Sequence, residues 1–147
     1  PAGARVLDVG CGYGIIGLLA ARLGAAQVEL ADVNLLAVAA ASENIRHNRI
    51  AQARAFASDG VPEGAPRRYD LVVSNPPFHV GKSVDGDIAR AFIERAQPAL
   101  EPSGRLVLVA NQFLRYDQVL RAAFEQVTCL ASNRSYRVWS ATNRGVV

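Results

Sequence analysis

Short apolar runs alternate along the chain with longer segments in which apolar residues recur every three or four positions. The short runs predict buried strands and the longer segments predict amphipathic helices, because side chains repeat with a period of about 2 on a strand and about 3.6 on a helix. Asn34 is a good N-cap for the second helical segment, and the Pro-Ser-Gly sequence at 102–104 predicts a turn. The strands are predicted at 5–9, 27–31, 53–57, 69–74 and 105–110, and the helices at 15–23, 35–47, 87–96 and 117–124.

The end of the chain departs from this alternation. Two β-rich runs, 127–132 and 136–140, are separated by only a few residues, which is typical of a hairpin and too short for a parallel crossover. Alternating strands and helices imply a parallel sheet with helices on both faces. The predicted fold class is therefore α/β, with a Rossmann-like, doubly wound, mostly parallel sheet that ends in an antiparallel hairpin.

Length and composition favour one domain. The chain has 147 residues, of which half are apolar, and domains usually contain about 100–200 residues. We therefore expect residues 1–147 to form a single domain. The sequence contains no methionine, so we expect it to be a fragment of a longer chain with a possible N-terminal domain. Because no apolar run approaches the roughly 20 residues of a membrane span, we expect a soluble cytoplasmic domain without a membrane partner.

The formal net charge of +3 suits a polyanionic partner such as nucleic acid but does not by itself establish one. Several basic residues lie late in the chain, where they could flank a substrate surface or simply form a solvated face. These residues are Arg115, Arg121, Arg134, Arg137 and Arg144.

The two cysteines, Cys11 and Cys129, are far apart in the sequence. This spacing suggests neither a disulfide framework nor a zinc site, so we predict no metal and a reducing cytoplasmic environment. Cys11 lies within a glycine-rich turn, where packing is a better explanation than nucleophilic chemistry. Cys129 is predicted to be buried in the hairpin.

A glycine-rich turn joins the first predicted strand to the first helix. Glycine at positions 10, 12 and 14 (Gly10, Gly12, Gly14) lets the backbone bend sharply and approach a ligand closely, which favours a nucleotide-like ligand. Asp32 ends the second strand, where it could accept ribose hydroxyl groups or cap the next helix. Asp59 follows the third strand, where it could accept an adenine amino group or begin a turn.

These residues and a later motif resemble a known family. Residues 8–14, Asp32, Asp59 and the Asn-Pro-Pro-Phe-His segment at 75–79 together resemble class I S-adenosylmethionine-dependent methyltransferases over almost the whole chain. Within that class the chain is most similar to the small-domain methyltransferases that include the ribosomal RNA guanine-N2 enzymes. Three further segments of that family occur in order here: Leu-Val-Ala-Asn at 108–111, Phe-Leu at 113–114 and Tyr-Arg-Val at 136–138.

The resemblance implies a seven-stranded sheet and S-adenosylmethionine as the cofactor. It implies that the methionine carboxylate and amino groups lie near Asp8 and Gly10, the ribose at Asp32 and the adenine at Asp59. A dinucleotide-binding oxidoreductase is a competing interpretation of the turn, since the frame of Gly12, Gly14 and Gly17 satisfies the GxGxxG fingerprint. The Asn-Pro-Pro-Phe loop decides against it, because dehydrogenases have no use for that loop there.

The loop at 75–79 carries the predicted catalytic groups. An exocyclic amine is a poor nucleophile until acceptors hold both N–H bonds, and Asn75 and Pro76 can supply a side-chain and a backbone carbonyl. Asn75 is also expected to contact the cofactor, and Phe78 to stack with a flipped-out base. Pro77 stiffens the loop and is expected to contact the substrate, and His79 is expected to contact the base or a phosphate. The alternative is an ordinary strand-terminating turn.

Three functional hypotheses follow. The first is methylation of guanine N2 in ribosomal RNA, with the small subunit favoured, which makes ribosomal RNA or a ribosomal subunit the expected partner. The second is methylation of a protein amide or another amine, which shares the cofactor chemistry. The third is a non-catalytic RNA-binding domain, which the retained glycines and the Asn-Pro-Pro loop argue against.

Overall fold

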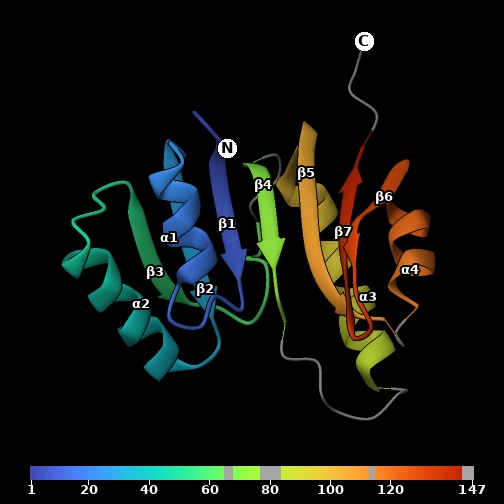
Figure 1. Ribbon diagram of the computed structural model, residues 1–147, viewed down its shortest axis with the longest axis horizontal. Helices are drawn as coiled ribbons and strands as arrows, with labels where there is room; N and C mark the ends of the chain where they lie inside the picture. The colour runs from blue at the N-terminus through green and yellow to red at the C-terminus, as the bar shows by residue number, and fades with distance from the viewer. Residues whose placement is uncertain (65–67, 77–83, 113–114, 144–147) are drawn as a thin grey trace.

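The computed structural model describes residues 1–64, 68–76, 84–112 and 115–143, which form one sheet with helices on both faces (Figure 1). Seven strands make up the sheet within these residues. The strands are β1 (Arg5–Val9), β2 (Gln27–Asp32), β3 (Ala53–Ala57), β4 (Tyr69–Ser74), β5 (Leu100–Asn111), β6 (Gln126–Ser132) and β7 (Tyr136–Thr142). The helices are α1 (Ile15–Arg22), α2 (Leu35–His47), α3 (Val84–Ala99) and α4 (Tyr116–Ala123).

The strand order is β3-β2-β1-β4-β5-β7-β6. Strands β1 to β5 pair in parallel, whereas β7 pairs antiparallel with both β5 and β6. The chain therefore starts at the centre of the sheet, winds outward to β3, and returns to the other side of β1 with β4. This confirms the predicted doubly wound sheet with an antiparallel terminal hairpin.

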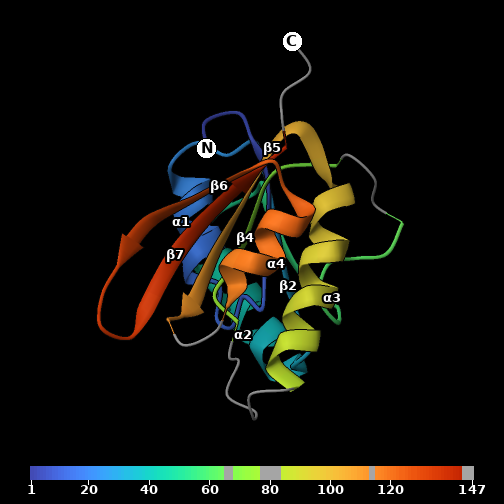
Figure 2. The same cartoon turned by 90° about the vertical axis from the view of Figure 1, so that its right-hand side faces the viewer.

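Two apolar cores lie on opposite faces of the sheet. Val6 of β1 joins the core beneath α1 and α2, whereas Leu7 and Val9 join the core beneath α3 and α4. Successive side chains of a strand point to opposite faces, so a strand buried on both faces is apolar along most of its length. Figure 2 shows α3 and α4 side by side on one face of the sheet. No helix of the described residues is long and apolar enough to span a membrane.

The start of α2 follows from local capping. The Asn34 side chain accepts a hydrogen bond from the Leu36 backbone N–H at 2.9 Å, which confirms the predicted N-cap. His47 ends α2 and is exposed. Arg46 also lies in the last turn, where a cation interacts favourably with the negative end of the helix dipole.

Two details of the sequence prediction were wrong. Residues 102–104 do not form a turn that precedes a separate strand, because β5 is continuous from Leu100 to Asn111. The proline and glycine instead fall in an irregularity of the β4–β5 pairing, between Leu100 and Arg105, which is where bulges accommodate such residues. Cys129 is exposed rather than buried, since β6 is the outermost strand of the sheet.

A buried acidic residue ties the first strands together. Glu29 of β2 is almost fully buried and accepts hydrogen bonds from Tyr69 and from Arg54 and Arg68, with the two arginine contacts at 2.9 and 2.8 Å. Burial opposes ionisation of the Glu29 carboxyl, but the hydrogen bonds from Tyr69 and Arg54 outweigh it and hold its pKa below the usual value. This cluster fixes β2, β3 and β4 relative to one another.

Candidate functional site

A cavity of about 600 Å³ lies at the carboxyl ends of the central strands. Its walls come from the turns that follow β1, β2, β3 and β4, and from α3. The sheet changes winding direction between β1 and β4, and α/β sheets bind their ligands at such switch points. The volume also falls within the range of small-molecule sites. The topology therefore places the candidate site here.

The glycine-rich turn divides into two parts. Gly10 and Gly12 line the cavity with positive φ angles of 69° and 56°. A Cβ atom on either residue would meet no other atom within 4 Å, so both positions open onto free space. Gly14 instead caps α1, and a Cβ there would lie 2.7 Å from Cδ2 of Leu30. The first two glycines are thus placed to face a ligand, whereas the third closes the turn against the core.

Asp32 is held at the cavity wall by backbone donors. Its Oδ2 accepts from the Gly12 N–H and its Oδ1 accepts from the Asn34 N–H, both at 2.9 Å. A carboxylate oxygen can accept more than one hydrogen bond, so both oxygens retain capacity toward the cavity. The carboxylate is oriented before any ligand arrives.

The turn after β3 adds a second acidic residue. The Ser58 backbone N–H donates to the Asp32 carbonyl at 3.0 Å, and the Arg95 guanidinium of α3 donates to the Asp59 carbonyl at 3.2 Å. These contacts fix the backbone of the turn on both sides. Asp59 lines the cavity and its side chain is exposed.

The end of β4 carries Asn75 and Pro76 to the same cavity. Ser74 is buried, and its hydroxyl donates to the Val9 carbonyl at 2.8 Å. That bond ties the end of β4 to the end of β1, so that both residues after it line the cavity. Pro77, Phe78 and His79 lie outside the described residues.

A comparison of the sequence with protein families agrees with this geometry. The methyltransferase small domain family matches residues 1–140. The chain belongs to this family. This match confirms the resemblance inferred from the glycine turn, the strand-end aspartates and the Asn-Pro-Pro-Phe loop. The dehydrogenase interpretation is rejected.

The methyltransferase domain is similar to two curated relatives with different named targets. It is 46% identical over 143 residues to the ribosomal RNA small subunit methyltransferase C of Chromohalobacter salexigens, covering 96% of this chain and 41% of the relative. It is 39% identical over 139 residues to the ribosomal RNA large subunit methyltransferase G of Alcanivorax borkumensis, covering 93% of this chain and 35% of the relative. The chain thus spans about two-fifths of the length of these relatives.

Among solved structures, the methyltransferase domain superposes on the 16S rRNA N2 G1207 methyltransferase RsmC of T. thermophilus with a TM-score of 0.84. The two chains are 36% identical, and the match covers 97% of this chain and 38% of the other. That structure contains AdoMet and guanosine.

Like Gly14, the predicted cofactor residue Asp8 does not line the cavity of the methyltransferase domain, and neither does Cys11, for which packing was predicted. Asp8 is 1% exposed, and its Oδ2 accepts from the Gly17 backbone N–H at 2.8 Å near the start of α1. The Asp8 side chain therefore stabilises the turn, because it accepts from a backbone N–H of the first turn of α1 that has no partner within the helix. Cys11 is buried, and burial raises the pKa of its thiol to about 12, which fits packing rather than nucleophilic chemistry.

Burial raises the pKa of Asp8 to about 6 from an ordinary value of 3.8, and the charge of Asp32 adds to the shift. Because the folded state holds the proton more tightly, the associated stability is full below about pH 4 and is lost as the pH rises through about 6. Asp8→Asn is expected to flatten this dependence by about 3 kcal/mol, since the amide keeps an acceptor for Gly17. Urea unfolding at about pH 4 and about pH 7 measures the slope. An unchanged slope would mean that another group carries the titration.

Sequence patterns missed the apolar wall of the cavity. Ile88 and Phe92 of α3 and Val33 after β2 line it, together with Ser58 and Arg95. Helical periodicity correctly assigned 87–96 to a helix, but it marks a buried stripe and does not say which turn of the helix lies over a ligand.

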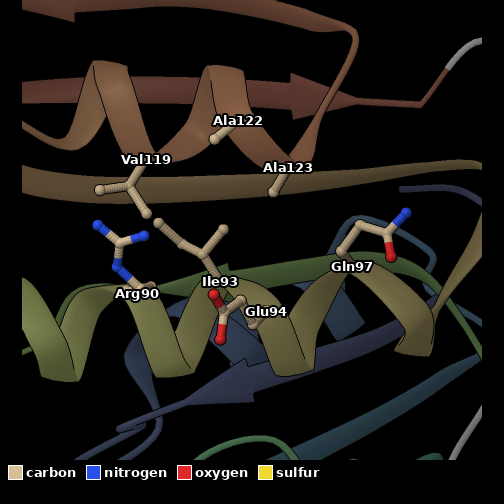
Figure 3. A pocket seen from close by; sticks show the side chains of 7 residues that line it. All are labelled: Arg90, Ile93, Glu94, Gln97, Val119, Ala122 and Ala123. Atoms are coloured by element: carbon tan, nitrogen blue, oxygen red, sulfur yellow. The ribbon is translucent and has the colours of Figure 1, made fainter.

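A second hollow, of about 310 Å³, lies between α3 and α4 (Figure 3). Ile93 and Val119 approach one another from the two helices, with Arg90 near one end and Gln97 near the other. None of the predicted site residues lines it. It lies between helices rather than at the carboxyl ends of the strands, so we assign the site to the larger cavity.

Proposed function

We propose that this domain binds S-adenosylmethionine in the 600 Å³ cavity and transfers its methyl group to the exocyclic N2 of a guanine in ribosomal RNA. The main support is that Asn75 and Pro76 line the same cavity as the glycine turn and Asp32. A cofactor held by the turn would then lie beside the groups that accept from the amine. We favour RNA of the small subunit as the substrate, and we place the reaction in the cytoplasm.

The cavity fits the cofactor in size and in the chemistry of its walls. Asp32 keeps free acceptor capacity for the two ribose hydroxyl groups, and Gly10 and Gly12 leave room for the methionine portion. Asp59 is available to the adenine amino group, while Phe92 offers an apolar surface to its ring. When bound, the cofactor supplies a sulfonium-activated methyl group.

The protein contributes positioning and electrostatics to methyl transfer. The lone pair of an exocyclic amine is delocalised into the base, so acceptors at both N–H bonds are needed to make the nitrogen nucleophilic. The Asn75 side-chain carbonyl and the Pro76 backbone carbonyl supply these acceptors from a loop that proline stiffens. Direct transfer then requires no covalent enzyme intermediate. Phe78 as a stacking platform, and Pro77 and His79 as substrate contacts, remain predictions.

The relatives support an RNA substrate. Both curated relatives are named for ribosomal RNA methylation, one of the small and one of the large subunit. The structure from T. thermophilus holds guanosine and is named for N2 methylation of 16S rRNA. The relative with the higher identity is the small-subunit enzyme, which supports our preference for that subunit.

Labelled S-adenosylmethionine distinguishes the RNA and protein hypotheses. The full-length protein is incubated with ribosomal subunits that lack the modification, and the products are treated with ribonuclease or with protease. We expect ribonuclease to release the label as nucleotides and protease to leave it in RNA. Label in peptides would instead support an amide substrate, and no label at all would support the non-catalytic hypothesis.

A further inference from the structure

The loop between β6 and β7 and the first two residues of β7 form a hairpin tip, residues 133–137, that is held by hydrogen bonds. The Asn133 N–H donates to the Tyr136 carbonyl at 2.9 Å, and the Asn133 side chain accepts from the N–H groups of Ser135 and Tyr136 at 2.8 and 2.7 Å. The Gln112 N–H, just after β5, donates to the Ser135 carbonyl at 3.0 Å. Hydrogen bonds thus hold the hairpin tip in shape and connect it to the residue that follows β5.

The hairpin tip lies at the same end of the sheet as the candidate site (Figure 1). Ser74 pairs with Leu108, and Asn111, three positions further along β5, pairs with Tyr136. At about 3.3 Å per residue and about 4.8 Å per strand, Tyr136 lies roughly 10 Å to the side of β4 and roughly 10 Å beyond Ser74. The tip therefore lies near the carboxyl end of β4, which is followed by Asn75.

The side chains of the tip are exposed and basic. Tyr136 is 46% exposed, Arg134 is exposed, and Arg137 is half-buried. Arg137 pairs with Ala110, which belongs to the core on the α3 and α4 face, so Tyr136 points to the opposite face. Among the ion pairs within the described residues, none involves either arginine. No acidic residue follows Glu125 in the sequence.

We propose that the hairpin tip binds the single-stranded RNA that flanks the target guanine, with Tyr136 stacking on a neighbouring base and Arg134 and Arg137 contacting phosphates. The inference rests on the proposed function and extends it to a substrate surface. Along the chain Tyr136 lies between Arg134 and Arg137, so the tip offers a ring on which a base can stack and, at its end and on its other face, cations that can contact the phosphates of a single strand. An acidic peptide would use the charges but leave the ring without a partner. The bracing of the tip lowers the entropy cost of binding.

The test measures RNA affinity separately from methyl transfer. A fluorescein-labelled single-stranded RNA oligonucleotide is titrated by anisotropy with the full-length protein, with Arg134→Ala/Arg137→Ala and with Tyr136→Ala. The control is Arg105→Ala/Arg121→Ala, which removes the same charge from the middle of β5 and the last turn of α4. S-adenosylhomocysteine affinity, measured by calorimetry, checks that the cavity is intact in every variant.

We expect each tip variant to bind the RNA about tenfold more weakly than the control, with unchanged S-adenosylhomocysteine affinity. The double arginine variant should also have a shallower slope of log K against log salt, by about 1.4 for two lost phosphate contacts. In methyl transfer the RNA KM should rise while kcat changes less than about twofold. Affinity and salt slope equal to those of the control would overturn the inference, even if the wild type methylates RNA. If the tip variants weaken RNA binding but the wild type does not methylate RNA, the proposed RNA-binding role of the tip stands and the proposed function is rejected.

Discussion

Replacing Asn75 with alanine is expected to lower kcat for methyl transfer by about 10²- to 10³-fold. Asn75 lines the cavity at the end of β4, and its amide oxygen is one of two acceptors assigned to the amine. Loss of one preorganised group that acts on the transition state typically costs this much. Single-turnover kinetics with saturating cofactor and RNA measures the step directly.

Asn75→Asp provides the matched comparison for this variant. Aspartate keeps an acceptor oxygen at the same position, so kcat should recover at least tenfold relative to alanine. Affinity for S-adenosylhomocysteine should change only a few-fold in both variants, because the glycine turn and Asp32 are untouched. Turnover by Asn75→Ala at the wild-type rate would remove Asn75 from the catalytic assignment.

Asp32→Ala is expected to weaken S-adenosylhomocysteine binding by about 100-fold. The substitution removes a charged acceptor for two ribose hydroxyl groups, and hydrogen bonds to charged groups contribute about 1.5–3 kcal/mol each. It also releases the N–H groups of Gly12 and Asn34, which the carboxylate now fixes at 2.9 Å. Isothermal titration calorimetry gives the dissociation constant.

Asp117→Ala in the first turn of α4 serves as the control for Asp32→Ala, since it removes an equal charge outside the residues that line the cavity. Its affinity for S-adenosylhomocysteine should equal that of the wild type. An affinity of Asp32→Ala within threefold of this control would contradict the assignment of the ribose to Asp32.

Much of the fold could be predicted because each strand and helix leaves a local signature. The apolar runs of β1 and β4, the hairpin spacing of β6 and β7, and the cap at Asn34 all depend on neighbouring residues alone. The cavity residues Gly10, Gly12, Asp32 and Asn75 were also found, since each ends or follows a strand that can be recognised from sequence.

The remaining features depend on contacts between distant segments. Asp8 and Gly14 belong to the motif, yet their burial against Gly17 and Leu30 is decided by how α1 packs on β2. Phe92 reaches the cavity only because one side of α3 forms part of its wall. The exposure of Cys129 follows from β6 being the edge strand, and a hairpin pattern alone does not say which of its strands is outermost.

The central claim is methyl transfer to guanine N2, and nucleoside analysis of the reaction product tests it most directly. The full-length protein is incubated with labelled S-adenosylmethionine and unmodified ribosomal RNA or subunits, and the RNA is digested to nucleosides and analysed by mass spectrometry. The account predicts label in N2-methylguanosine, with Asn75→Ala greatly reducing it. Label in another nucleoside, or in protein with none in RNA, would contradict it.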